Sequence, residues 1–92
     1  MKTKAIEDLR RQTELMSSVS QMKLTTAYRE VVGSGQSAVP VLLQELQRQP
    51  DVAIMAALSD LTNANPVPKP IVGSVRQMAK AWLEWGRLNN MI

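Results

Sequence analysis

The sequence predicts an all-α fold: a compact bundle of about five short helices in one domain, residues 1–92. Apolar side chains recur every three or four residues along most of the chain, which is the spacing of one helix face. No stretch shows the sustained apolar–polar alternation of a strand, and the four glycines fall at expected breaks or near helix ends. A chain of 92 residues is long enough for one domain with a small core.

The first helix is predicted over residues 3–19, within an N-terminal segment of residues 1–20. Leu15 and Val19 are expected to widen its apolar stripe. The run "SSVS" at residues 17–20 then predicts a break and a new N-cap. The stripe itself consists of Ile6, Leu9, Thr13 and Met16.

Residues 21–62 are expected to form helical hairpins. The second helix is predicted over residues 21–32, and the run "GSG" at residues 33–35 ends it, with Gly33 as a left-handed C-cap. Its apolar face consists of Leu24, Ala27, Tyr28 and Val31.

The third and fourth helices are predicted over residues 36–49 and 51–63. Pro40 is tolerated because it lies in the first turn of the third helix, and Pro50 ends that helix. Asp51 is expected to cap the fourth helix. The apolar stripes consist of Val39, Leu42, Leu43 and Leu46 in the third helix and Ile54, Leu58 and Leu61 in the fourth.

A proline-rich connector, "NANPVPKP", covers residues 63–70. Asn65, Val67 and Lys69 each precede a proline, which disfavours helix and predicts an extended, polyproline-like path. The connector is either a stiff spacer or a Pro-rich epitope for a partner's groove. The spacer is favoured because Val67 and Ile71 have the character of residues that pack inward.

The last helix, predicted over residues 71–88, has the strongest periodicity of the chain. Trp82 is expected in the core, because a domain without Phe needs large apolar anchors. Trp85 lies nearer the helix end and becomes a binding hot spot if part of it reaches the surface. Gly86 is either an interior glycine or the C-cap. The stripe consists of Ile71, Val75, Met78, Trp82 and Trp85.

The composition argues against an enzyme. The chain has no Cys and no His, which removes the thiolate nucleophile, the imidazole base and the usual zinc ligands. The carboxylates fall on polar helix faces or caps, and "GSG" lacks the lysine of a phosphate-binding loop. We therefore expect no catalytic residues, no metal and no cofactor. No signal sequence or membrane span is visible, so a cytoplasmic protein is expected.

The surface candidates are basic and apolar. Six methionines predict adaptable surfaces in places. The apolar candidates for contact with a partner are Trp85, Leu88 and Met91. The basic candidates, at or near one face of the last helix, are Lys69, Arg76, Lys80 and Arg87. Glu84 stands between Lys80 and Arg87 and is expected to pair with both, which favours an ordinary solvated face over a phosphate-binding one. A second group of basic residues lies near the N-terminus and consists of Lys2, Lys4, Arg10 and Arg11. This group adds to the basic face of the last helix only if the fold brings the two ends of the chain together.

Two resemblances accompany this interpretation. The segment "SGQSAVPVLLQELQRQPDVAIMAALSDLT" resembles one helical hairpin of the HEAT type. The later segment, with "NPVP" at residues 65–68, Gly73, Met78, "AWL" at 81–83 and "WG" at 85–86, is similar to a group of small bacterial proteins of uncharacterised function. That group has aromatic residues at the start of the fourth helix, where this chain has "VAIMAA". The resemblance implies a helical-hairpin fold and carries no activity with it.

We therefore expect a non-enzymatic protein–protein interaction module, such as an inhibitor or antitoxin-like accessory of bacterial or phage origin. Paired helices of HEAT type commonly present surfaces for protein partners. The alternative is a nucleic-acid-binding accessory that uses the basic N- and C-terminal helices, with weak binding because the net charge is only +3. Two hairpins are too few for a long solenoid, so the domain closes its own core or forms a homodimer.

Overall fold

The computed structural model describes residues 3–71 and 73–92. Met1 and Lys2, within the predicted N-terminal segment, and Val72, within the predicted last helix, lie outside the described residues. The described chain contains helices and no strand, which confirms the all-α prediction. No helix within it has the length and apolar character needed to cross a membrane.

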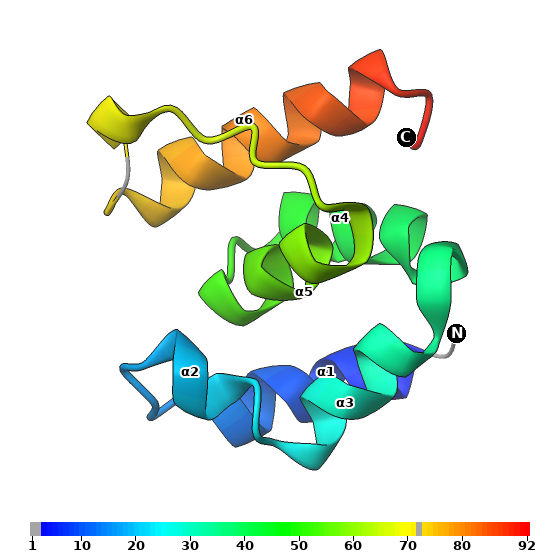
Figure 1. The fold of residues 1–92 in the computed structure, drawn as a ribbon, viewed down its shortest axis with the longest axis vertical. Helices are drawn as coiled ribbons and strands as arrows, with labels where there is room; N and C mark the ends of the chain where they lie inside the picture. The colour runs from blue at the N-terminus through cyan, green and yellow to red at the C-terminus, as the bar shows by residue number, and fades with distance from the viewer. Residues whose placement is uncertain (1–2, 72) are drawn as a thin grey trace.

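The helices are arranged in three layers (Figure 1). The green pair in the middle separates the orange helix at one end from the blue and cyan helices at the other. The elements are α1 (Thr3–Thr13), α2 (Val19–Met22), α3 (Thr26–Gly33), α4 (Ala38–Arg48), α5 (Val52–Thr62) and α6 (Val75–Leu88), with short 3₁₀ turns η1 (Gly35–Ser37) and η2 (Lys69–Ile71). The assignment of α4 and α5 to the HEAT type stays a prediction.

The middle layer supplies the centre of the core. All four residues of the predicted α4 stripe are buried, and Ile54 and Leu58 of α5 are buried with them. Asp51 caps α5 as predicted: its carboxylate accepts hydrogen bonds from the amides of Ala53 at 2.8 Å and Ile54 at 3.4 Å. Pro40 lies in the first turn of α4, where its missing N–H costs little.

The first predicted helix is too long. α1 ends at Thr13, whose hydroxyl donates to the carbonyl of Leu9 at 2.6 Å, a bond that competes with helix continuation. The chain then turns, and the amide of Met16 bonds the carbonyl of Thr13 at 3.0 Å. Leu15 does not widen the buried stripe, because it is 95% exposed.

The second predicted helix is divided into α2 and α3. Thr25 separates them, since its hydroxyl accepts a hydrogen bond from the amide of Tyr28 at 3.2 Å and so begins α3. Leu24 falls in this break and is exposed, contrary to the expected buried face. The left-handed cap predicted at Gly33 is also wrong: the residue after it, Ser34, is right-handed, and Gly35 carries the positive φ of 76°.

The last helix begins later than predicted. The amide of Ile71 bonds the carbonyl of Pro68 at 3.2 Å, so Ile71 belongs to the turn η2 rather than to the helix. Ser74 then caps α6. Trp82 is only 3% exposed, as expected for the core anchor. Gly86 is a buried interior residue, and a Cβ there would lie 2.7 Å from the Cδ1 atom of Leu43, so glycine allows α6 to lie close to α4.

Candidate partner-binding groove

A groove of about 520 Å³ lies between the proline-rich connector and the outer flank of α6. Figure 1 shows the connector, in yellow-green, running alongside the orange helix. The lining is almost entirely apolar and consists of Pro66, Pro68, Ile71, Gln77, Lys80, Ala81, Glu84, Trp85 and Leu88. The connector thus forms one wall of this groove.

The local sequence explains why the groove stays open. Pro66 and Pro68 cannot join a helix, and the helix-free path from Asn63 to Pro68 keeps them beside α6. On α6, the lining residues come from two neighbouring rows, three and four residues apart along the helix. Ala81 has a short side chain, which leaves space between Ile71 and Trp85.

Trp85 is the largest side chain of the groove. It is half-buried, and its ring contacts Trp82 in a T-shaped arrangement, with ring centroids 5.6 Å apart and planes at 72°. Trp82 is fixed in the core, so it holds Trp85 in place without covering it. A rigid, partly exposed tryptophan offers contact area at a low cost in side-chain entropy, which is typical of interface hot spots.

Positively charged side chains outnumber negatively charged ones around the groove. Glu84 is its one acidic lining residue, and it pairs with Arg87 rather than with both neighbours as predicted. Lys80 lines the groove, and Arg76 lies one turn before it on the exposed side of α6. Among residues 3–71 and 73–92, Lys69, Arg76 and Lys80 have no ion-pair partner. The surroundings of the groove are therefore net positive.

The structure brings together only some of the predicted partner-binding residues. Trp85, Leu88 and Lys80 line the groove, and Lys69 lies between its Pro68 and Ile71. Two candidates lie elsewhere. Arg87 borders an adjoining hollow, which shares Lys80 and Glu84 with the groove. Met91 is half-buried because the tail folds back, and its amide bonds the carbonyl of Gly86 at 2.8 Å.

The basic residues of α1 do not extend this positive region. α1 lies on the opposite side of the middle layer from α6 (Figure 1). Lys4 and Arg11 both pair with Asp8, and the hydrogen bond from Lys4 holds the pKa of Asp8 below its usual value. Among the described residues, the basic side chains of α1 and α6 therefore do not form one face.

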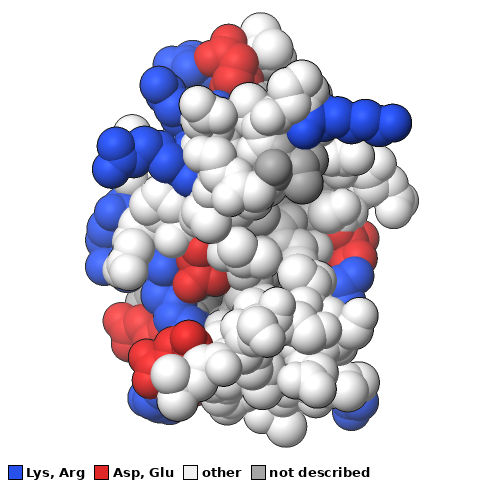
Figure 2. Space-filling view, turned by 90° about the vertical axis from the view of Figure 1, so that its left-hand side faces the viewer, with Lys and Arg blue, Asp and Glu red and all other residues white. Residues whose placement is uncertain are grey.

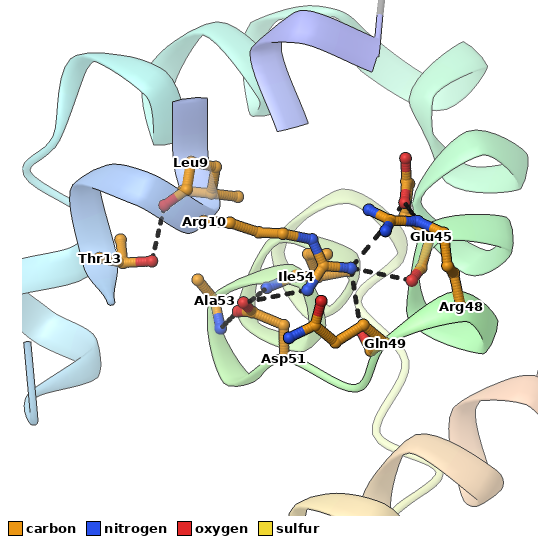
Figure 3. Close-up of polar contacts among 9 residues, drawn as sticks. All are labelled: Leu9, Arg10, Thr13, Glu45, Arg48, Gln49, Asp51, Ala53 and Ile54. Atoms are coloured by element: carbon orange, nitrogen blue, oxygen red, sulfur yellow. Dashed lines mark hydrogen bonds and ion pairs between the residues drawn. The ribbon is translucent and has the colours of Figure 1, made fainter. Parts of the chain in front are cut away.

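Arg10 has a structural role that the sequence did not indicate (Figure 3). Its guanidinium donates to the carbonyls of Glu45 and Gln49, both at 2.9 Å, and to the carboxylate of Asp51 at 3.4 Å. These carbonyls belong to the C-terminal end of α4, where helix carbonyls commonly need partners outside the helix, and Asp51 is the N-cap of α5. Arg10 thus joins α1 to the turn between α4 and α5, with its side chain only 14% exposed.

A second polar contact, which is part-buried, joins α3 to α5. The hydroxyl of Tyr28 donates to the carboxylate of Asp60 at 2.5 Å, and Lys23 pairs with the same carboxylate at 3.3 Å. Burial raises the pKa of Tyr28 above its ordinary value, with a further contribution from Asp60. The phenol therefore keeps its proton and is unsuited to act as a base.

A second surface, which the sequence did not locate, lies where α2, the start of α5 and the start of α6 meet. It is of mixed polarity, because Arg10, Glu14 and Asp51 line it beside apolar side chains. Two adjoining hollows of about 320 and 300 Å³ share Val52. Four of the six methionines line them: Met16, Met22, Met55 and Met78. Figure 2 shows the face turned this way as largely uncharged, with charged side chains along its margins. The methionine content was the only sequence signal for such an adaptable surface.

Comparison of the chain with models of protein families, with curated proteins and with solved structures finds no match. The candidate site therefore depends on the geometry of this chain alone. The described residues contain no group of three or more acidic side chains placed to hold a metal ion.

Proposed function

We propose that this protein is a non-enzymatic protein–protein interaction module, and that its groove between the connector and α6 receives an apolar segment of a protein partner. One observation carries the proposal: Trp85 lies partly exposed in an apolar groove while Trp82 holds it from the core. Interfaces concentrate their binding energy in such anchored aromatic residues.

The dimensions support binding of a short segment. A volume of about 520 Å³ is within the ordinary range for pockets that enclose a small ligand. On a peptide or helix, this corresponds to a few side chains inserted between the prolines and Trp85. Val67 of the connector and Trp85 of α6 pack against the core, which favours binding with little ordering of this protein.

The available side chains favour binding over catalysis. The lining of the groove offers Lys80, Glu84 and Gln77 as its only strongly polar side chains, and Glu84 is paired with Arg87. A protein that only binds needs no more than this. An inhibitor or antitoxin-like accessory of bacterial or phage origin acts in that way.

The test is site-specific photo-crosslinking in cells that naturally produce the protein. A photoreactive amino acid replaces Gln77 on the groove, or Gln44 on the exposed side of α4 as a control. We expect a discrete protein adduct from position 77 and none from position 44. The adduct should disappear when Trp85→Asp is introduced into the same chain, with far-UV circular dichroism confirming that this variant is folded. Equal adducts from both positions, or adducts that survive Trp85→Asp, would contradict the proposal.

A further inference from the structure

The geometry points to the chemistry of the occupant: we infer that the groove selects an apolar peptide segment flanked by Asp or Glu residues. This inference rests on the proposed function, because it concerns the partner of the same groove. Its starting observation is the cation Lys80, which borders the apolar lining and has no carboxylate partner among the described residues.

Two further cations are near lining residues in the sequence, although they do not line the groove themselves. Arg76 lies four residues before Lys80 and is exposed on the same helix, so the two side chains are neighbours on its surface. Lys69 is exposed on η2, between the groove-lining Pro68 and Ile71. Positive charge therefore approaches the groove both from α6 and from the connector.

Most of the other described basic residues are paired, and Arg29 on α3 is the exception. Lys4 and Arg11 share Asp8, Arg10 pairs with Asp51, Lys23 with Asp60, Arg48 with Glu45 and Arg87 with Glu84. The cations around the groove are left without such carboxylates. A partner that supplies carboxylates there gains complementary charge, while a basic partner meets like charge, and such complementarity selects partners and accelerates association.

The apolar lining favours a peptide over a nucleic acid. Phosphates would find only three unpaired cations here, and the groove would bury prolines, Ile71 and Trp85 against a strongly hydrated backbone. An acidic amphipathic peptide satisfies both parts of the surface. Its apolar side chains enter the groove while its carboxylates reach Lys80 and Arg76 at the edge.

The experiment is selection of a displayed library of random twelve-residue peptides on the full chain, with counter-selection on Trp85→Asp to discard peptides that bind elsewhere. We expect selected peptides to combine bulky apolar residues with an excess of Asp and Glu. The affinity of the best peptide should fall at least about tenfold, equivalent to 1.4 kcal/mol, in the double variant Arg76→Glu, Lys80→Glu. Arg29→Glu, an exposed residue of α3 that does not line the groove, is the control and should bind like wild type.

The outcomes separate this inference from the function on which it rests. Peptides that require Trp85 but show no acidic excess, and that bind the double variant equally well, would overturn the inference and leave the groove as a protein-binding site. Failure to select any peptide that depends on Trp85 would overturn both. Displacement of the selected peptide by a mixed DNA and RNA pool at nanomolar concentration would replace the acidic peptide with a nucleic acid as the ligand of these cations.

Discussion

Arg10 and Lys80 are both cations beside apolar surfaces, and the fold uses them in opposite ways. Arg10 is largely buried and donates to three acceptors from the turn between α4 and α5. Lys80 is exposed and has no ion-pair partner in the described part of the chain. The first region, the Arg10 joint, uses its polar groups for stability. The second, the groove beside α6, leaves its cation available for a ligand.

The two tryptophans repeat this contrast within one helix. Trp82→Ala should lower the free energy of unfolding by about 3–5 kcal/mol, because Trp82 is buried and a cavity would remain. Trp85→Ala should cost about 1 kcal/mol, since that ring is only half-buried. Urea unfolding followed by circular dichroism measures both. Equal losses would show that Trp85 belongs to the core and that the groove is not a binding surface.

The Arg10 joint should show the next largest effect. Arg10→Met keeps much of the side-chain volume but removes one hydrogen-bond donor from each of the Glu45 and Gln49 carbonyls and from the Asp51 carboxylate. Glu45 and Asp51 keep their backbone amide donors. We expect a loss of about 3 kcal/mol in the free energy of unfolding. Arg11→Met is the matched control, because Arg11 is 68% exposed and pairs only with Asp8, so its loss should stay below about 1 kcal/mol. An Arg10→Met variant with the same free energy of unfolding as wild type would remove the distinction between the two regions.

The parts of the fold that could be predicted depend on residues that are close in the sequence. The stripe of α4, the buried position of Trp82 and the Asp51 cap depend on spacings of two to four residues, and such spacings are visible in a single sequence. The stripe predicted for the last helix is confirmed only in part, because Val75 is exposed and Ile71 lies in η2. The partners of Arg10 lie 35 to 41 residues away, and two are backbone carbonyls, which have no sequence signature.

The candidate site was predicted in part for the same reason. Trp85 and Lys80 follow from the periodicity of α6, but the opposite wall depends on where the connector returns along that helix. The methionine-lined surface depends on α2, a single turn that is separated from α3 by the Thr25 cap. Short elements of this kind are fixed by tertiary contacts rather than by helical periodicity.

Ionisation of Tyr28 tests its part-buried contact with Asp60, away from the groove. Tyr28 is the only tyrosine, so absorbance at 295 nm reports its ionisation alone. Burial raises the pKa of Tyr28, so the phenol should stay protonated in the folded protein at pH 11, whereas an unfolded chain ionises near pH 10. The contribution of Tyr28 to the free energy of unfolding is complete below about pH 10. It is lost as the pH rises further, because only the unfolded state releases the phenol proton there. Ionisation near pH 10 with intact helical circular dichroism would contradict this contact.

We expect the weakest signal from a test of nucleic-acid binding. Only three cations near the groove lack ion pairs among the described residues, so the logarithm of affinity for duplex DNA should fall by at most about 3 per tenfold increase in salt, at roughly 0.9 per phosphate neutralised. Fluorescence anisotropy with a mixed DNA and RNA pool at near-physiological salt should therefore detect only weak binding. Nanomolar binding that is abolished by Arg76→Glu, Lys80→Glu would assign the free cations to a nucleic acid.

The most direct measurement of the central claim compares stability and partner binding in the same two variants. Unfolding free energy and the yield of the crosslinked adduct from position 77 are measured for Arg10→Met and Trp85→Ser. We expect Arg10→Met to lose about 3 kcal/mol of stability and to keep its adduct while folded, and Trp85→Ser to lose about 1 kcal/mol and its adduct. An Arg10→Met variant that is folded but yields no adduct, or a Trp85→Ser variant that keeps its adduct, would contradict the division between a stabilising joint and a binding groove.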